Sequence, residues 1–380
     1  MNDLLNVALP MAEILIIKRD FDLLRKIATQ FKPEIQMQLV PFTALFCYEA
    51  IEYLNKKGQK VEIDQTSKYS IKDIRQKAKF FDLSINKLLQ SVRNVDKLQN
   101  EEFISLMLYP QLGNCNFHDN IGIFFDDKKN VVGNSHYAFF VFQDEKIISK
   151  PTDSMNGQAI HGKEIQAFAY DMGRIIGSIT SAFSSISDFI VADINIDSII
   201  LFSQDFNTNR CLIMENEGFK IIRLFLLHVL SSIGFILFVM KKAIIRDSGL
   251  LLRFEYITYH YAIKRLEGIM NYCNKNIGEI GDPNLLKVLN SIDYSNSNGL
   301  IKSEFRNCMM HFSLFNIEGT PLIDETQIDL SKPFCGLIES QFDMTYDEYK
   351  CKIEEQLSVL SEKIKDYMDF PLLLYSEDEK

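Results

Sequence analysis

The stretch that decides the fold is FKIIRLFLLHVLSSIGFILFVMKKAIIRDSG, residues 219 to 249. Apolar residues cover most of this segment, and Gly249 is the residue type that commonly ends a helix. The pattern predicts one long helix closed by Gly249. A helix that is apolar on all sides lies either at the centre of a helical bundle or in a membrane.

Residues 224–240 are the part of this helix that raises the membrane alternative. They are slightly fewer than the ~20 apolar residues that cross a bilayer, and Arg223 borders them. Polar or small residues also interrupt the segment: His228, Ser231, Ser232 and Gly234. We expect the central helix of a bundle, and the alternative is a membrane-inserted effector.

The sequence that follows also has helical spacing. Residues 251–275 predict a second long helix, residues 284–292 a shorter one and residues 346–370 the last one. Between them, YSNSNG at 294–299 predicts a loop, and EFRNCMMHFSLF at 304–315 predicts a further helix. The sum is a C-terminal helical bundle.

The preceding half of the chain mixes helices with strands. Residues 20–98 have helical spacing, and residues 162–183 predict another helix. Between 120 and 149, aromatic and β-branched runs alternate with turn residues, which predicts two or three short antiparallel strands. Alternation over residues 187–206 predicts one or two more strands.

Length and composition set the class of protein. The chain has 380 residues, and a prior of about 150 residues per domain suggests two domains. We predict a mainly α protein in which residues 1–215 form an N-terminal α+β sensor or regulatory domain with a small antiparallel sheet. Residues 216–380 form the helical bundle.

Charge and cysteine usage exclude several classes of function. The net charge of −10 repels phosphate backbones, which excludes a general nucleic-acid coat and confines any nucleic-acid contact to a local site. The cysteines number seven, with no CxxC pair, as in a reduced chain without structural zinc. The N-terminus lacks the positive charge of a signal peptide. We therefore expect a cytoplasmic protein.

FRNCMMHF, residues 305–312, places polar residues within an apolar helix. On a helix Asn307 and His311 lie over one another, with Arg306 beside them. A stripe on the opposite side is predicted to be buried: Phe305, Cys308, Met309, Phe312 and Phe315. The polar trio should face a cleft, a partner chain or water.

His228 and His260 lie in long apolar or aromatic helices, and we expect them to be core histidines.

Arginine, a polar residue, three variable positions and histidine, late in a helical bundle, resemble the motif of the HEPN superfamily. The resemblance covers roughly residues 218–370. It implies a metal-independent endoribonuclease without cofactor, of a toxin, abortive-infection or antiphage system, that dimerises to form a composite site. The family's catalytic positions correspond here to Arg306, Asn307 and His311. In members regulated by nucleotidylation a tyrosine follows the histidine by two positions, but Ser313 stands there.

The chemistry of metal-free RNA cleavage explains these residue types. A base must take the 2′-hydroxyl proton, an acid must protonate the leaving oxygen, and a cation must stabilise the phosphorane. Histidine can perform either proton transfer, and arginine grips phosphate oxygens. Asn307 would orient His311 or hold a phosphate oxygen. Because one protomer supplies one such histidine, we expect a homodimer through the bundle.

The specificity of the motif depends on Asn307. Arginine followed at some distance by histidine also occurs at Arg223/His228 and Arg253/His260, but of these three arginines only Arg306 is followed directly by asparagine. Basic residues between 219 and 275 outnumber acidic ones and predict a local RNA-binding surface: Lys220, Arg223, Lys241, Lys242, Arg246, Arg253, Lys264, Arg265 and Lys275.

An alternative is a non-catalytic bundle that binds a nucleotide or a partner, with Arg306 and His311 bonded to a neighbour such as Glu304. The expected partners are an RNA substrate, a second copy of the chain and an antitoxin or phage-derived trigger, whereas a membrane is not expected.

Overall fold

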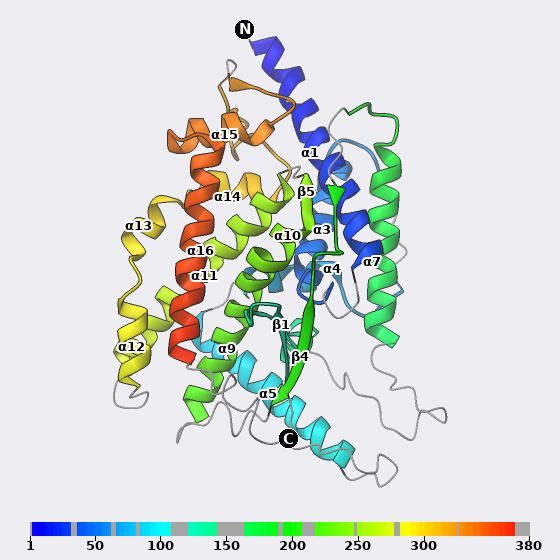
Figure 1. Cartoon of the computed structure of the whole chain (residues 1–380). Coiled ribbons are helices and arrows are strands. Elements are labelled where there is room, and N and C mark those ends of the chain that lie inside the picture. The colour runs from blue at the N-terminus through cyan, green and yellow to red at the C-terminus, as the bar shows by residue number, and fades with distance from the viewer. Residues whose placement is uncertain are drawn as a thin grey trace.

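The structure is a computed structural model that describes residues 2–31, 36–61, 66–80, 84–107, 121–142, 163–188, 193–206, 217–246, 249–276, 282–324 and 327–368. Within these ranges the protein is mainly α, with a three-stranded and a two-stranded antiparallel sheet (Figure 1). The predicted fold class is therefore confirmed.

Helix α9 (Glu217–Gly234) occupies the position expected of a central bundle helix. It continues into the π-helical stretch η4 (Phe235–Met240) and then α10 (Lys241–Ala243). The helix Phe219–Ala243 is long and apolar enough to cross a membrane. However, 89% of its most apolar 18-residue stretch is buried inside the protein. It packs against α5 (Ile85–Met107), α11 (Leu250–Lys275), α16 (Tyr346–Met368) and strand β2 (Val131–Asn134). Its apolar surface is therefore covered by the chain itself.

The long helix ends before Gly249, which corrects the prediction. Residues Ile244–Arg246 form strand β5, which pairs with β3 (Asp193–Ile194). Gly249 instead precedes α11 (Leu250–Lys275) and has a positive φ of 96°. A Cβ atom there would lie 2.6 Å from the ring of Phe334. Glycine is thus required for a turn between two elements, a role that its sequence position does not distinguish from a helix end.

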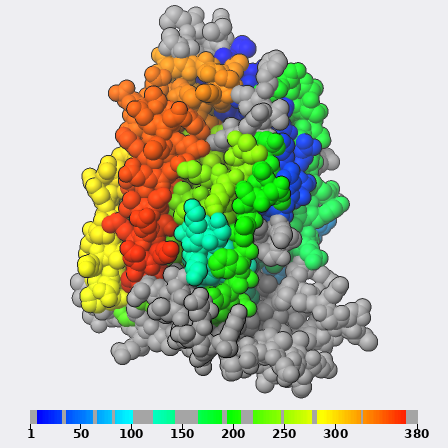
Figure 2. Space-filling view, in the orientation of Figure 1, coloured from blue at the N-terminus to red at the C-terminus, as the bar shows by residue number. Residues whose placement is uncertain are grey.

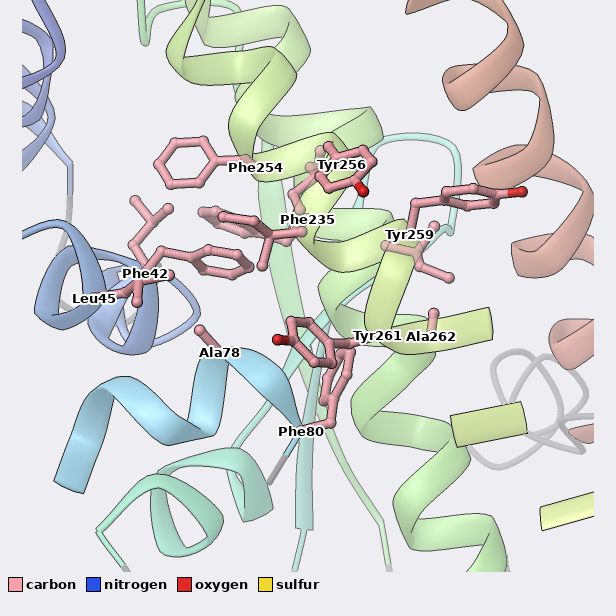
Figure 3. Packing of buried hydrophobic residues seen from close by; sticks show 14 of the residues in the cluster. Phe42, Leu45, Ala78, Phe80, Phe235, Phe254, Tyr256, Tyr259, Tyr261 and Ala262 are labelled. Carbon is pink, nitrogen blue, oxygen red and sulfur yellow. The ribbon is translucent and has the colours of Figure 1, made fainter. Parts of the chain in front are cut away.

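Helix α11 is the second core helix. Every residue from Leu250 to Ile263 is buried. Figure 3 shows Phe42 of helix α3 (Val40–Lys56) close to Phe254, and their rings meet edge to face with centroids 5.2 Å apart. The second long helix is confirmed, and it is covered by N-terminal as well as C-terminal elements.

The remaining C-terminal helices surround α11 and α9. They are α12 (Pro283–Asn290), α13 (Tyr294–Gly299), α14 (Ser303–Met310), α15 (Pro333–Phe342) and α16 (Tyr346–Met368). The loop predicted at 294–299 is wrong, because Asp293 accepts a hydrogen bond from the Asn296 amide and caps the helix α13. Helix α15 was not predicted from the sequence.

The N-terminal section contains helices α1, α3, α5 and α7 and most of the strands. Its elements are α1 (Asn2–Gln30), α4 (Ile71–Ile74), η1 (Arg75–Lys79), α5 (Ile85–Met107), α6 (His136–Val141), α7 (Lys163–Ala182), β1 (Ile121–Asp126), β2 (Val131–Asn134) and β4 (Leu201–Phe206). The larger sheet has the antiparallel order β2-β1-β4.

A third strand after β2 does not form, because the Asn134 side chain accepts a hydrogen bond from the Tyr137 amide and starts α6. Residues 143–150 lie outside the described part.

One hydrophobic core crosses the boundary predicted at residue 215. Its buried members extend from Leu9 to Met368, and α1 and α3 contribute as well as α11 and α14. Figure 2 shows N-terminal and C-terminal helices side by side on one face of the molecule. The division into two domains stays a prediction, but the two sections share side-chain packing at the candidate site.

Candidate active site

Helix α14 presents the motif, and its buried side explains its position. Phe305, Cys308, Met309 and Phe312 are each at most 4% exposed, whereas Phe315 is only partly buried. The Phe305 ring packs edge to face on Tyr256 of α11, at 4.9 Å, and on Tyr349 of α16, at 5.3 Å. The predicted buried stripe is confirmed for its first four members, and it leaves Arg306 and Asn307 partly exposed.

The helix is shorter than predicted and ends at Met310. His311 follows in an extended conformation, with φ −111° and ψ 149°. Two distant side chains hold the departing chain. Arg253 Nε donates to the Met309 carbonyl at 2.7 Å, and Glu13 accepts from the Leu314 amide at 2.8 Å. Because both partners come from outside the motif, its sequence alone predicts a continuing helix.

Arg306 and Asn307 interact with each other. The guanidinium donates through Nη2 at 2.7 Å and Nε at 3.2 Å to Oδ1 of Asn307. Asn307 therefore orients the arginine. Its backbone carbonyl accepts from the His311 amide at 2.7 Å, but the structure gives no side-chain hydrogen bond between Asn307 and His311 within the described residues.

His311 is held by a carboxylate from the N-terminal section. Its Nδ1 lies 2.6 Å from Oε2 of Glu49 on α3, and its side chain is 46% exposed whereas that of Glu49 is 8% exposed. Arg75 of η1 donates to the other carboxylate oxygen at 3.0 Å. The Arg75 guanidinium also lies over the Tyr48 ring, 4.0 Å from its centroid. Glu49 is thus fixed on both oxygens.

This arrangement can prepare His311 for proton transfer. A carboxylate bonded to Nδ1 keeps the ring hydrogen on that atom and leaves Nε2 as the acceptor. The ring is accessible, so Nε2 can meet a ligand. Glu49 was not predicted from the sequence. The one available signal is a charged residue at an otherwise apolar, buried position of α3, where glutamate rarely stands unless it is paired.

Arg253 lies beneath the motif and belongs to the core. It is fully buried, forms an ion pair with the fully buried Asp20, and its guanidinium lies 4.2 Å from the ring centroids of both Phe46 and Phe312. Burial lowers the pKa of Arg253, and Asp20 opposes that shift. The pair Arg253/His260 is therefore structural.

His228 and His260 are buried, as predicted, with 0% and 1% exposure. Burial, together with the charges of Lys264, Arg306, Arg265 and Lys79, lowers the pKa of His260 to about 3. Cations from α11, α14 and η1 thus surround this position.

At least four of the nine basic residues between 219 and 275 form ion pairs within the described ranges of the fold. Carboxylates from other elements pair with several of them: Lys220 with Asp96, Lys241 with Glu354, Lys242 with Asp127 and Arg253 with Asp20. A local excess of charge in the sequence is thus neutralised by residues far along the chain.

Within the described part of the chain, no three His, Cys, Asp or Glu side chains gather into a set that could hold a metal ion. Comparison of the chain with models of protein families, with curated proteins and with solved structures finds no match.

Proposed function

We propose that the protein is a metal-independent endoribonuclease of the HEPN type, acting as a bacterial toxin or antiphage effector. The observation that carries the proposal is the 2.6 Å contact between Glu49 Oε2 and Nδ1 of the half-exposed His311. It supplies an oriented imidazole one residue beyond a helix that presents Arg306. Cleavage at a ribose phosphate needs an oriented base beside a cation.

Each residue has a distinct role in this proposal. His311 transfers a proton through Nε2, and Glu49 is its positioning residue. Arg306 binds a non-bridging phosphate oxygen and stabilises the charge of the phosphorane. Asn307 holds the guanidinium in place through the 2.7 Å hydrogen bond. The role of Asn307 is thereby changed from orienting His311 to orienting Arg306.

A second copy of the chain completes the site. One imidazole cannot act as base and acid in the same step, and His260 is buried and neutral at pH 7. A twofold homodimer through the bundle brings two His311 side chains to one substrate. Residues 1–215 sense the trigger and, through Glu49, supply part of the site. The expected location remains the cytoplasm.

RNA cleavage by the purified full chain in EDTA tests the function. The wild-type protein should cleave, whereas His311→Gln and Arg306→Lys should lose activity by about a hundredfold or more, the range for general acid–base and charge-stabilising groups. Arg25→Ala is the matched control because Arg25 is exposed on α1, outside the site. Cleavage retained by His311→Gln would contradict the proposal.

One observation favours the non-catalytic alternative. Arg306, Asn307 and His311 all have partners within the chain, as expected of a satisfied surface. The partner of His311 is Glu49 rather than a helix neighbour such as Glu304. In this alternative the bundle binds a partner, and His311→Gln leaves cellular toxicity unchanged.

A further inference from the structure

A second candidate site lies away from the motif, in a cavity of about 640 Å³ between α5, α9 and α11. None of the residues that line it is Arg306, Asn307, His311 or Glu49. The volume falls within the range of small-molecule sites, about 300 to 1,000 Å³. The cavity is therefore large enough for a ligand of nucleotide size.

The chemistry of the lining selects for an anion. Among the described residues that line the cavity, the charged ones are Arg93 of α5 and Lys275 of α11, both positive. Arg93 Nη1 donates to Oε1 of Gln90, at 2.9 Å, which places the guanidinium on the polar wall. Two cations on facing helices can neutralise a phosphate from both sides.

The first turn of α5 adds backbone donors at the same place. Ser84 and Asn86 line the cavity, and the Leu88 amide donates to the Ser84 carbonyl at 3.0 Å, which closes the first turn. The amides between these residues have no acceptor within their own helix and point toward its N-terminal end. The positive end of α5 therefore reinforces the two side-chain cations.

The apolar walls and the polar rim of the cavity match the base and the ribose of a nucleotide. Ile85 of α5 and Tyr272 of α11, both half-buried, supply apolar surface on the walls. The rim includes the amides of Asn271 and Asn276 on the α11 side. An apolar surface beside convergent amide donors and acceptors matches a flat heterocycle with hydrogen-bonding edges.

We propose that this cavity binds a nucleoside 5′-phosphate, with the phosphate between Arg93 and Lys275 and the base against Ile85 and Tyr272. The proposal is independent of the ribonuclease activity, because it uses none of the residues of that site.

The close approach of two helices offers a way to obstruct the cavity. Gly268 of α11 lines it, and a Cβ atom at this position would lie 2.7 Å from Cδ1 of Ile85. Gly268→Val would displace the Ile85 side chain and so alter the wall of the cavity. Arg93→Ala and Lys275→Ala change only exposed side chains, so they test the charge without threatening the fold.

Binding of AMP, GMP, CMP and UMP to the full chain in EDTA, measured by calorimetry and thermal shift, tests the proposal. At least one nucleotide should bind and raise Tm by about 3 °C at a hundredfold excess over Kd. Arg93→Ala and Lys275→Ala should each weaken binding by about tenfold, and Gly268→Val should abolish it. His311→Gln and the control Arg25→Ala should leave binding unchanged.

Binding of two further ligands distinguishes a nucleotide site from a site for a nucleoside or for phosphate alone. The matching nucleoside without phosphate should bind at least about tenfold more weakly, and inorganic phosphate should bind more weakly than the nucleotide. Absence of binding by all four nucleotides would overturn the proposal. Equal binding of nucleoside and nucleotide, equal binding of phosphate alone, or binding that His311→Gln removes and Arg93→Ala does not, would also overturn it.

Discussion

Glu49 and His311, which are 262 positions apart, meet through a 2.6 Å contact between Oε2 and Nδ1. This contact joins α3 to His311, the residue that follows α14. The N-terminal section therefore contributes to the candidate active site directly.

Glu49→Gln tests whether this contact prepares the histidine. Glutamine keeps the size but removes the negative charge that holds the hydrogen on Nδ1, so the rate of RNA cleavage should fall by at least about tenfold. Nitrogen NMR of the His311 ring should show the Nδ1–H tautomer in the wild type and a mixture in the variant. Glu304→Gln, on the exposed first turn of α14, is the matched control and should change neither property.

The buried pair of Arg253 and Asp20 should dominate local stability. Both side chains have 0% exposure, so Arg253→Met removes the cation that balances a carboxylate in the core and should lower the free energy of unfolding by about 3 to 5 kcal/mol. The double variant Asp20→Leu with Arg253→Met should recover much of this loss in chemical denaturation. Lys241→Met breaks the Lys241–Glu354 pair, which is 48% exposed on the lysine side, and should cost less than about 1 kcal/mol. Equal losses in both single variants would contradict this assignment.

Buried histidines should make the fold sensitive to acid. Burial lowers the pKa of His136 and His260 to about 3 and that of His228 well below 6.5, whereas the unfolded chain protonates near 6.5. The unfolded state therefore binds more protons between pH 6.5 and 3, and stability is present above 6.5 and lost as the pH falls. Each histidine should contribute a slope of about 1.4 kcal/mol per pH unit.

His260→Phe tests this pH dependence. Both ring nitrogens lack a hydrogen-bond partner among the described residues, and the rings of Tyr256 and Tyr261 lie 5.9 and 4.8 Å away. Phenylalanine should therefore fit and should reduce the slope by about 1.4 kcal/mol per pH unit between pH 6 and 4. An unchanged slope in urea titrations at several pH values would exclude a neutral buried His260.

Gly234 should be required for the packing of α9 on β2. A Cβ atom there would lie 1.9 Å from the Val131 carbonyl oxygen, so Gly234→Ala should lower the free energy of unfolding by about 2 kcal/mol or more. Gly177 on α7 has nothing within 4 Å of the same atom, and Gly177→Ala should raise stability by about 0.5 to 1 kcal/mol. Thermal unfolding measures both, and destabilisation by Gly177→Ala as large as that by Gly234→Ala would argue against the contact.

Periodicity was sufficient to predict α9, α11 and α16, although not where α9 ends, and it did not predict that α1 begins at Asn2. The apolar spacing of α9, α11 and α16 predicts their positions because such helices must bury their apolar surface. It fails where distant residues decide the local structure. The chain leaves the helix at Met310 because Arg253 and Glu13 hold the following segment.

The candidate site was predictable only in part. The order of residues in the motif identifies Arg306, Asn307 and His311 and predicts which side of α14 is buried. It cannot identify Glu49, because no local spacing relates residues in α3 and at the end of α14. The excess of basic residues between 219 and 275 likewise does not reveal which of them form ion pairs, because Asp20, Asp96 and Glu354 come from other elements.

The termini of the RNA fragments test the central claim most directly. Attack by the 2′-oxygen, with His311 moving the proton and no metal present, leaves a 2′,3′-cyclic phosphate on one fragment and a 5′-hydroxyl on the next. Mass spectrometry of fragments made in EDTA should show these ends for the wild type and no fragments for His311→Gln. Fragments with 3′-hydroxyl and 5′-phosphate ends, or identical fragments from both proteins, would contradict the account.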